Sequence, residues 1–240
     1  MTTEDEALRR LQDEGGNPAS VTPQTYGEGP EQVFETHGPT DARTLVVVHG
    51  GYFRPAIDRT HSRPMARALA AQGWRVVLAE YRRVPGTPFA TTEDVTALDA
   101  HLREHGHDVA AWVGHSAGGA LVLWRALTTQ LPPVKVVALA PVSDFDRAVA
   151  ERLGGDAVSD WIGSAHGAVD RLDPTRLLTA NPVAAERIHL IHGDQDRTVP
   201  VSQGEALPVE WTVVAGAHHF DLIDPTSPHW PTVLAALNQR

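Results

Sequence analysis

A serine flanked by glycines follows one of the most apolar stretches of the chain. Gly114-His115-Ser116-Ala117-Gly118 comes after the strand-like run 109–113 and opens a helix-like segment at 118–128. So sharp a turn needs very small flanking residues, because a side chain there would collide with the neighbouring backbone. A strand, Gly-x-Ser-x-Gly and a helix, in that order, expose the serine beside helix N–H groups, where it can act as a nucleophile. The bare pattern also fits a helix N-cap serine in a glycine-rich turn.

Candidate partners for this serine follow two later strand-like runs. A serine hydroxyl is a poor nucleophile and needs a base, usually a histidine that a carboxylate holds in the right tautomer. Two aspartates and two histidines stand just past such runs: Asp194, Asp196, His218 and His219. All four are therefore expected at the same sheet edge as Ser116, in the chain order serine, acid, histidine. Residue types alone leave open which member of each pair takes part.

A second glycine-rich turn, His49-Gly50-Gly51-Tyr52-Phe53, follows the strand-like run 44–48. An acyl-transfer enzyme must stabilise a developing oxyanion, and backbone N–H groups do so where glycines allow a close approach. The alternative is a strand-to-helix turn without a catalytic role.

Strand-like and helix-like segments alternate along most of the chain. Near-continuous runs of Val, Leu and Ile, typical of strands buried on both faces, lie at 44–48, 75–79, 109–113, 134–140, 188–191 and 211–214. A weaker strand signal lies at 32–36, and helix-like segments lie at 61–72, 92–104, 118–128 and 232–238. This alternation predicts an α/β fold of three layers, with a mostly parallel, doubly wound sheet between helices.

The ends of this pattern carry two further signals. Thr3-x-x-Glu6 has the form of a capping box, and Gly15-Gly16 would end the short helix that it begins. The polar segment of about 144–181 interrupts the alternation, and we interpret it as a small cap over the carboxyl edge of the sheet. A surface excursion with one buried helix is the alternative. The whole chain, 1–240, is expected to be one domain.

Composition excludes several classes of function. The chain has 240 residues and a net charge of −10, which argues against a nucleic-acid partner. Its apolar runs are too short to cross a membrane. It has no cysteine, its thirteen histidines are scattered, and it lacks H-E-x-x-H, so we expect neither a metal site nor a cofactor. The acidic start Met1-Thr-Thr-Glu-Asp-Glu is unlike a signal peptide, and a cytoplasmic protein is expected.

From residue 40 onwards these motifs together resemble the α/β-hydrolase-fold serine hydrolases. Gly193-x-x-Asp196-x-x-Val199-Pro200 is similar to the segment that supplies the acid in that family. Gly216-x-x-His219-Phe220 is similar to the setting of the family's histidine. The resemblance therefore implies a triad of Ser116, Asp196 and His219, with Asp194 shaping its loop.

Two branches of the family carry a segment like the one at His49. The hormone-sensitive-lipase-like esterases have H-G-G-G, where this chain has Tyr52 as the fourth residue. The kynurenine formamidase-like branch has H-G-G-x-W, where this chain has Phe53. The stretch Tyr52 to Pro64 and the run Ala79-Glu80-Tyr81-Arg82-Arg83 also resemble that branch. The resemblance implies an oxyanion hole formed by the N–H groups of Gly51, Tyr52 and Ala117.

The expected activity is hydrolysis of a small-molecule carboxylic ester or amide through an acyl-enzyme. The first alternative is an arylformamidase of the N-formyl-kynurenine type; an acyltransferase or lyase using the same triad, or a ligand-binding module without catalysis, are the others. Phe53, His115 and Trp161 are candidate pocket residues, although ordinary packing would also explain them. A homodimer is possible through the edge near the last strand.

Overall fold

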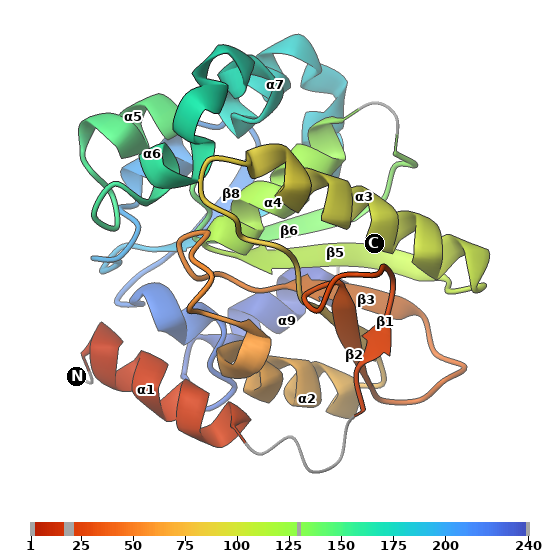
Figure 1. Ribbon diagram of the computed structural model, residues 1–240. Helices are drawn as coiled ribbons and strands as arrows, with labels where there is room; N and C mark the ends of the chain where they lie inside the picture. The colour runs from red at the N-terminus through yellow and green to blue at the C-terminus, as the bar shows by residue number, and fades with distance from the viewer. Residues whose placement is uncertain (1–2, 17–21, 129–130, 239–240) are drawn as a thin grey trace.

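The chain folds around a twisted sheet, described here from a computed structural model over residues 3–16, 22–128 and 131–238. Within these ranges eight strands pair in the order β1-β2-β4-β3-β5-β6-β7-β8 (Figure 1). Their bounds are β1 Gln24–Thr25, β2 Val33–His37, β3 Thr44–Val48, β4 Arg75–Ala79, β5 Val109–His115, β6 Lys135–Leu139, β7 Ile188–Gly193 and β8 Glu210–Val214. The β1–β2 and β2–β4 pairs are antiparallel, and all neighbouring pairs from β4 to β8 are parallel.

Strand positions follow the apolar runs closely. β3 and β4 have the predicted bounds, and β5 and β7 each extend two residues further toward the edge where the chemistry was expected. The weak signal at 32–36 is a strand, β2, while β1 was not predicted, since its two exposed residues bury nothing. Side chains alternate between two cores: Val46 and Val48 face one, and Leu45 and Val47 face the other. Because both faces are covered, the strands are apolar at nearly every position.

Helices cover both faces of the sheet, which gives the three expected layers. α1 Glu4–Gly15, α2 Arg63–Ala71 and α9 Trp230–Asn238 lie on one face, and α3 Pro88–Glu104 and α4 Ala117–Leu127 lie on the other (Figure 1). α3 begins four residues earlier than predicted, because Pro88 is well tolerated in a first helical turn.

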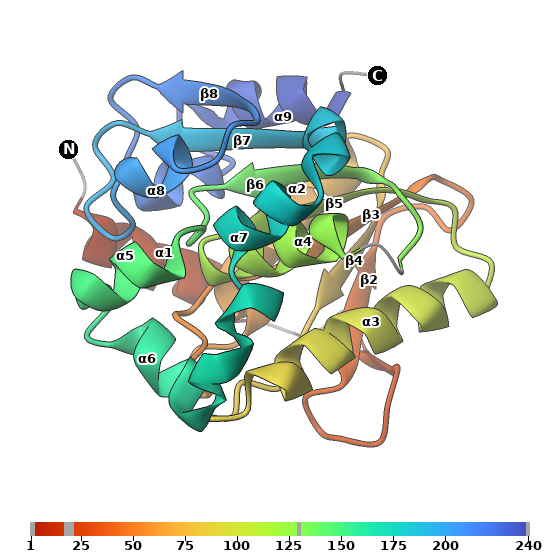
Figure 2. The same ribbon diagram turned by 90° about the horizontal axis from the view of Figure 1, so that it is seen from above.

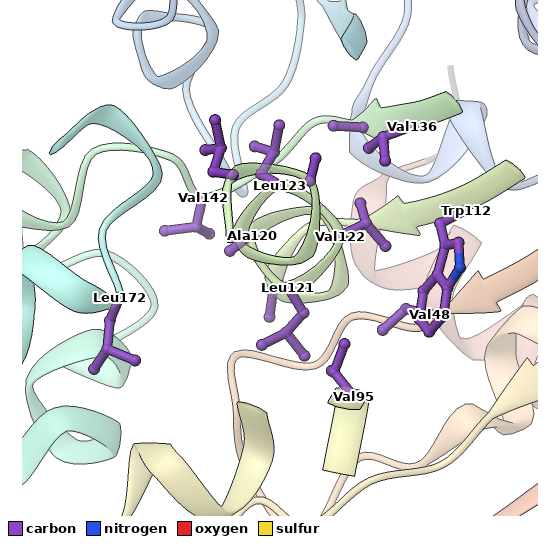
Figure 3. Close-up of a cluster of buried hydrophobic side chains, with 14 of the residues drawn as sticks. Val48, Val95, Trp112, Ala120, Leu121, Val122, Leu123, Val136, Val142 and Leu172 are labelled. Carbon is purple, nitrogen blue, oxygen red and sulfur yellow. The ribbon is translucent and has the colours of Figure 1, made fainter. Parts of the chain in front are cut away.

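α4 is buried along almost its whole length. Apolar side chains surround it in Figure 3, with Val48 and Trp112 from the strands on one side and Leu172 on another. A helix that is apolar on nearly all sides is fixed by packing in every direction. Its first residue directly follows Ser116, so this rigid element sets the position of that serine.

α1 packs across the ends of other elements. Its capping box is present: the Glu6 N–H donates to Thr3 Oγ1 at 3.3 Å, and the Thr3 N–H donates to Glu6 Oε2 at 2.8 Å. The helix ends at Gly15, where a Cβ would lie 1.9 Å from the Thr60 carbonyl oxygen. α1 contacts two short 3₁₀ turns, η1 Arg59–Ser62 and η4 His219–Leu222.

The segment between β6 and β7 is a group of short helices that the sequence did not resolve one by one. It contains α5 Phe145–Ala150, α6 Ala157–Ile162, η2 Gly163–Arg171, α7 Pro174–Ala180 and η3 Pro182–Arg187. Figure 2 shows α5 and α6 beyond the end of the sheet to which the parallel strands point, on the same side of the molecule as α1. The remaining short helix, α8 Ser202–Glu205, follows β7.

Candidate active site

Ser116 occupies a strained turn between β5 and α4. Its φ is +57° and its ψ is −119°, a region that residues other than glycine seldom adopt. The turn is held by neighbouring backbone: the Ser116 N–H donates to the Leu139 carbonyl at 2.9 Å, and the Ser116 carbonyl accepts from Val142 at 3.3 Å. Such strain persists only where the surroundings determine the conformation, and here two strands and a buried helix do so.

The neighbouring glycines fit the expected collisions. A Cβ at Gly114 would lie 2.2 Å from the Gly118 carbonyl oxygen, and a Cβ at Gly118 would lie 2.2 Å from the Val48 carbonyl oxygen. At Gly50 it would lie 2.9 Å from Ser116 Cβ. These are contacts with backbone or with the serine itself, so no rotamer change relieves them. Glycine is therefore required at 114 and 118 for steric reasons.

Asp196 and His219 meet at the carboxyl ends of β7 and β8. His219 Nδ1 lies 2.7 Å from Asp196 Oδ2. The other carboxylate oxygen, Oδ1, accepts from the N–H groups of Thr198 at 3.0 Å and Val199 at 2.7 Å. Burial alone would raise the pKa of Asp196, but His219, His192 and the Val199 N–H outweigh it and hold the pKa well below its ordinary value. Asp196 is thus a buried carboxylate that remains charged.

The structure does not bring Asp194 and His218 into this arrangement. Asp194 is exposed, and its Oδ1 accepts from the Gly216 N–H at 2.8 Å, which shapes the two loops from outside. His218 is turned toward Asp221, which accepts from the His218 N–H at 2.8 Å. Asp196 and His219 are therefore the pair in contact with each other, and His219 lines the same cavity as Ser116.

Ser116 and His219 line one small cavity of about 40 Å³. Its walls come from the loop after β3, the serine turn, the loops after β7 and β8, and the helix α1: Leu8, Gly51, Tyr52, Ile57, His61, His115, Ser116, Thr198, His219 and Phe220. His115, a predicted pocket residue, is thus part of the wall, and its Nε2 lies 3.0 Å from the His219 carbonyl oxygen.

Phe53 and Trp161 lie elsewhere. Their rings stack on each other, with centroids 4.0 Å apart and planes at 8°, and both are buried. Trp161 Nε1 donates to Thr91 Oγ1 at 3.0 Å. Neither residue is among the described residues that line the cavity beside Ser116. They join the β3 loop to α6 as core packing, the alternative that the sequence had left open.

The loop after β3 approaches the serine in an unusual conformation. Gly51, Tyr52 and Phe53 have φ values of +127°, +54° and +55°. At Gly51 a Cβ would lie 2.8 Å from Ile57 Cγ2, so glycine is favoured by both space and conformation. The Arg54 N–H donates to the Gly51 carbonyl at 2.9 Å and closes the turn. Gly51 and Tyr52 both reach the cavity, and Ala117 begins α4, where first-turn N–H groups lack helical partners.

A buried network of charges supports this loop. His49 Nε2 lies 3.0 Å from Glu80 Oε1, and the Tyr81 hydroxyl donates to the His49 carbonyl at 2.7 Å. Arg83 pairs with the same carboxylate, and Arg59 Nη1 donates to its Oε2 at 3.2 Å. Burial would raise the pKa of Glu80, but His49 and Arg83 hold it well below its ordinary value.

His61 is a cavity residue that the sequence analysis missed. It is 2% exposed, and its Nδ1 has no hydrogen-bond partner. Burial, together with nearby His49, lowers the pKa of His61 to about 3, so the ring is neutral at physiological pH. Nothing in its local sequence distinguishes it from the other scattered histidines, and only the packing of η1 against α1, α2 and β4 brings it to the cavity.

Neither a metal centre nor a membrane-spanning helix occurs among the described residues. Over 3–16, 22–128 and 131–238, no group of three or more His, Asp or Glu side chains is arranged to hold a metal ion. None of the helices in these same ranges combines the length and apolar character needed to span a membrane.

Comparison with known proteins places the fold. A family model described as the alpha/beta hydrolase fold matches residues 45–204, and the chain belongs to this family. The match spans the serine turn, the β3 loop and Asp196. The family resemblance inferred from the motifs is thereby confirmed, and so is the fold class, an α/β hydrolase with a mostly parallel sheet. No curated protein matches the chain.

Solved structures agree with this assignment of the fold. A candidate thioesterase from Silicibacter sp. tm1040 is 21% identical, with a TM-score of 0.76 over 100% of this chain and 95% of that one. An inhibited esterase B from Lactobacillus rhamnosis is 20% identical, with a TM-score of 0.70 over 97% and 90% of the two chains. The butyrate-bound esterase Est2 from Thermogutta terrifontis is 16% identical, with a TM-score of 0.66 over 91% of each chain.

Proposed function

We propose that this protein is a serine hydrolase that cleaves small-molecule carboxylic esters through an acyl-enzyme. The observation that carries the proposal is the 2.7 Å contact between His219 Nδ1 and Asp196, at a cavity that His219 shares with Ser116. A serine in a strained turn, a histidine and a charged buried carboxylate are the three groups that nucleophilic acyl transfer requires.

In the proposed mechanism His219 Nε2 takes the proton of the Ser116 hydroxyl as Oγ attacks the carbonyl carbon. Asp196 accepts the hydrogen bond from His219 Nδ1–H, which fixes the tautomer and stabilises the imidazolium. His219 then gives the proton to the departing alcohol as the acyl-enzyme forms. In the second half, His219 takes a proton from water as the water attacks the acyl carbon. The imidazolium then gives that proton to Ser116 Oγ as the acid is released.

The negative charge that develops on the carbonyl oxygen needs donors that are already in place. We assign this role to the backbone N–H groups of Gly51, Tyr52 and Ala117. The positive φ values at Gly51 and Tyr52 and the packed start of α4 support the assignment, because they fix these groups beside Ser116 before substrate binds. Removing one such donor typically costs about 100-fold to 1,000-fold in kcat.

Cavity size favours a short acyl group. A water molecule needs about 10–15 Å³ of such space, so a cavity of about 40 Å³ holds only a few non-hydrogen atoms. Acetyl and butyryl groups fit this limit better than long chains. That the fold neighbour from Thermogutta terrifontis is an esterase with bound butyrate supports the same class.

Formamide hydrolysis is the second candidate. A formyl group is the smallest acyl group and suits the small cavity, and the segment His49 to Phe53 is similar to that of the formamidase-like branch. The same triad would attack the formyl carbon and expel an aromatic amine.

One experiment tests both candidates. We would compare wild type and Ser116→Ala on p-nitrophenyl acetate, butyrate and octanoate, and on N-formyl-kynurenine. We expect acetate and butyrate to be cleaved far faster than octanoate, with loss of activity by a factor of about 10⁶ in the variant. A preference for the formamide would favour the second candidate. Activity retained in Ser116→Ala would contradict both.

A reactive phosphonate separates the remaining alternatives. Mass spectrometry should show one added phosphonyl group per wild-type chain and none on Ser116→Ala. Absence of labelling would favour a ligand-binding module. Labelling without hydrolysis, together with turnover when an acceptor other than water is added, would favour an acyltransferase. A cytoplasmic location and a homodimer stay predictions.

A further inference from the structure

One carboxylate of α1 touches both loops that carry the proposed acid and base. Glu4 Oε1 accepts from the Arg197 N–H at 2.9 Å and from the His219 N–H at 3.2 Å. Glu4 Oε2 accepts from the Thr198 hydroxyl at 2.6 Å. Arg197 and Thr198 directly follow Asp196, so the three donors belong to the loop after β7 and the loop after β8. Glu4 is separated from all of them by more than 190 positions in sequence.

The contacts of Thr198 extend this link. Its N–H donates to Asp196 Oδ1 at 3.0 Å, and its carbonyl accepts from the Tyr52 hydroxyl at 3.3 Å. The residue held by Glu4 therefore also contacts the proposed acid and the loop proposed to form the oxyanion hole. Three loops that carry different parts of the chemistry meet at this point.

α1 can hold the loops because it is itself fixed elsewhere. Ala7 and Leu11 are buried against the core on the α2 side of the sheet. Arg10 pairs with Asp224, and Arg63 Nη1 donates to the Gly15 carbonyl at 2.9 Å. These contacts lie one to three turns away from Glu4, so the helix position does not depend on Glu4 alone.

We propose that Glu4 is a positioning residue for the hydrolysis proposed above: it locks the loop of Asp196 to the loop of His219. A carboxylate that accepts three hydrogen bonds fixes two chain segments relative to each other, and acyl transfer needs the imidazole within a fraction of an ångström of its working place. The inference rests on the proposed function. It adds α1, which no triad motif includes, to the groups that determine turnover.

The test uses the full chain with four variants. Glu4→Ala removes all three contacts, whereas Glu4→Gln keeps Oε1 as an acceptor and presents an N–H to Thr198 Oγ1. Asp5→Ala is the matched control in the same turn, because Asp5 is exposed. Glu6→Ala breaks the capping box and loosens the helix without removing a loop contact. Steady-state kinetics on p-nitrophenyl butyrate and thermal unfolding are measured for each.

Glu4→Ala is expected to lower kcat by about 10-fold to 100-fold, with less than about a threefold change in KM. Glu4→Gln should recover kcat to within about fivefold of wild type, and Asp5→Ala should stay within about twofold. A Glu4→Ala enzyme within threefold of wild type would overturn the proposal. So would a Glu6→Ala loss as large as that of Glu4→Ala, or a Glu4→Gln loss equal to the alanine variant.

A spectroscopic readout separates this proposal from the proposed function. The low-field proton resonance of His219 Nδ1–H, assigned with ¹⁵N-histidine labelling, reports the contact with Asp196 without any substrate. We expect it in wild type, Asp5→Ala and Ser116→Ala, and expect it broadened or lost in Glu4→Ala. An unchanged resonance in Glu4→Ala would overturn the role of Glu4 even in an active esterase. An inactive wild type with the expected pattern would overturn only the esterase assignment.

Discussion

One carboxylate oxygen of Asp196 lies 2.7 Å from His219 Nδ1, and the other accepts hydrogen bonds from two backbone N–H groups of the loop that carries Asp196. The orientation of the carboxylate is thus set by the chain segment that carries it, independently of the histidine. A histidine that acts as a general base is helped by a charged, immobile acceptor at its other ring nitrogen, because such an acceptor favours one tautomer and stabilises the imidazolium.

Asp196→Asn tests this relationship. We expect kcat to fall by about 10⁴-fold with little loss of stability, because the amide keeps the shape but favours the wrong tautomer of His219. Asp194→Asn is the control, since Asp194 lies on the outside of the same loop. Steady-state kinetics on p-nitrophenyl acetate measure both. Equal losses in the two variants would show that loop structure, and not the contact with His219, sets the rate.

The glycines of the serine turn should tolerate no side chain. Gly118→Ala places a Cβ 2.2 Å from the Val48 carbonyl oxygen, so β3 and α4 must separate. We expect a loss of several degrees in melting temperature and nearly complete loss of phosphonate labelling. Gly16→Ala is the control, because Gly16 is exposed and has right-handed helical backbone angles. A Gly118→Ala protein as stable and reactive as Gly16→Ala would contradict the steric explanation.

The cavity wall supplied by α1 should limit acyl length. Leu8 lines the cavity, and Leu8→Ala removes three carbon atoms from that wall. We expect the kcat/KM ratio of p-nitrophenyl hexanoate to acetate to rise by about 10-fold, a difference of about 1.4 kcal/mol in transition-state binding. Leu234→Ala, a partly buried leucine of α9, is the matched control for lost packing. If both variants keep the wild-type ratio, α1 does not define the acyl pocket.

Acid stability should depend on Glu35, which is buried between two arginines. Arg63 Nη2 lies 2.7 Å and Arg59 Nε 2.8 Å from Glu35 Oε1. Burial would raise the pKa of Glu35, but His37, Arg63 and Arg59 lower it from 4.5 to about 2. Since the folded pKa is the lower one, this group stabilises the fold fully above pH 4.5. That stabilisation is lost as the pH falls from about 4.5 to about 2.

Glu35→Gln is therefore expected to cost about 3 kcal/mol at pH 7 and to flatten the dependence of stability on pH below 4.5. Denaturant unfolding at several pH values measures the effect. Glu31→Gln, an exposed neighbour in sequence, should retain the wild-type pH dependence. A Glu35→Gln curve parallel to that of wild type between pH 4.5 and 2 would show that the carboxylate does not titrate as proposed.

Much of the fold and the location of the site follow from the sequence. In runs such as Thr44–Val48 and Arg75–Ala79 nearly every position is apolar, because the side chains alternate between two sheet faces that are both covered. This pattern predicts that both runs are central strands. Parallel strands end at a common edge, so chemistry-bearing residues that follow different strands must gather there. The serine turn is partly local, because a Cβ at Gly114 would collide with the carbonyl oxygen of Gly118, only four positions further along the chain.

Contacts between distant segments were decided only by the tertiary structure. Phe53 and Trp161 are of residue types that often line ligand pockets, yet here their rings stack on each other. An aromatic ring suits a core as well as a ligand site. His61 reaches the cavity and Glu4 reaches both loops from segments whose local sequence has no catalytic motif. A periodic pattern records which face of an element is buried. It does not record which side chain lies opposite, since that depends on how separate elements pack together in three dimensions.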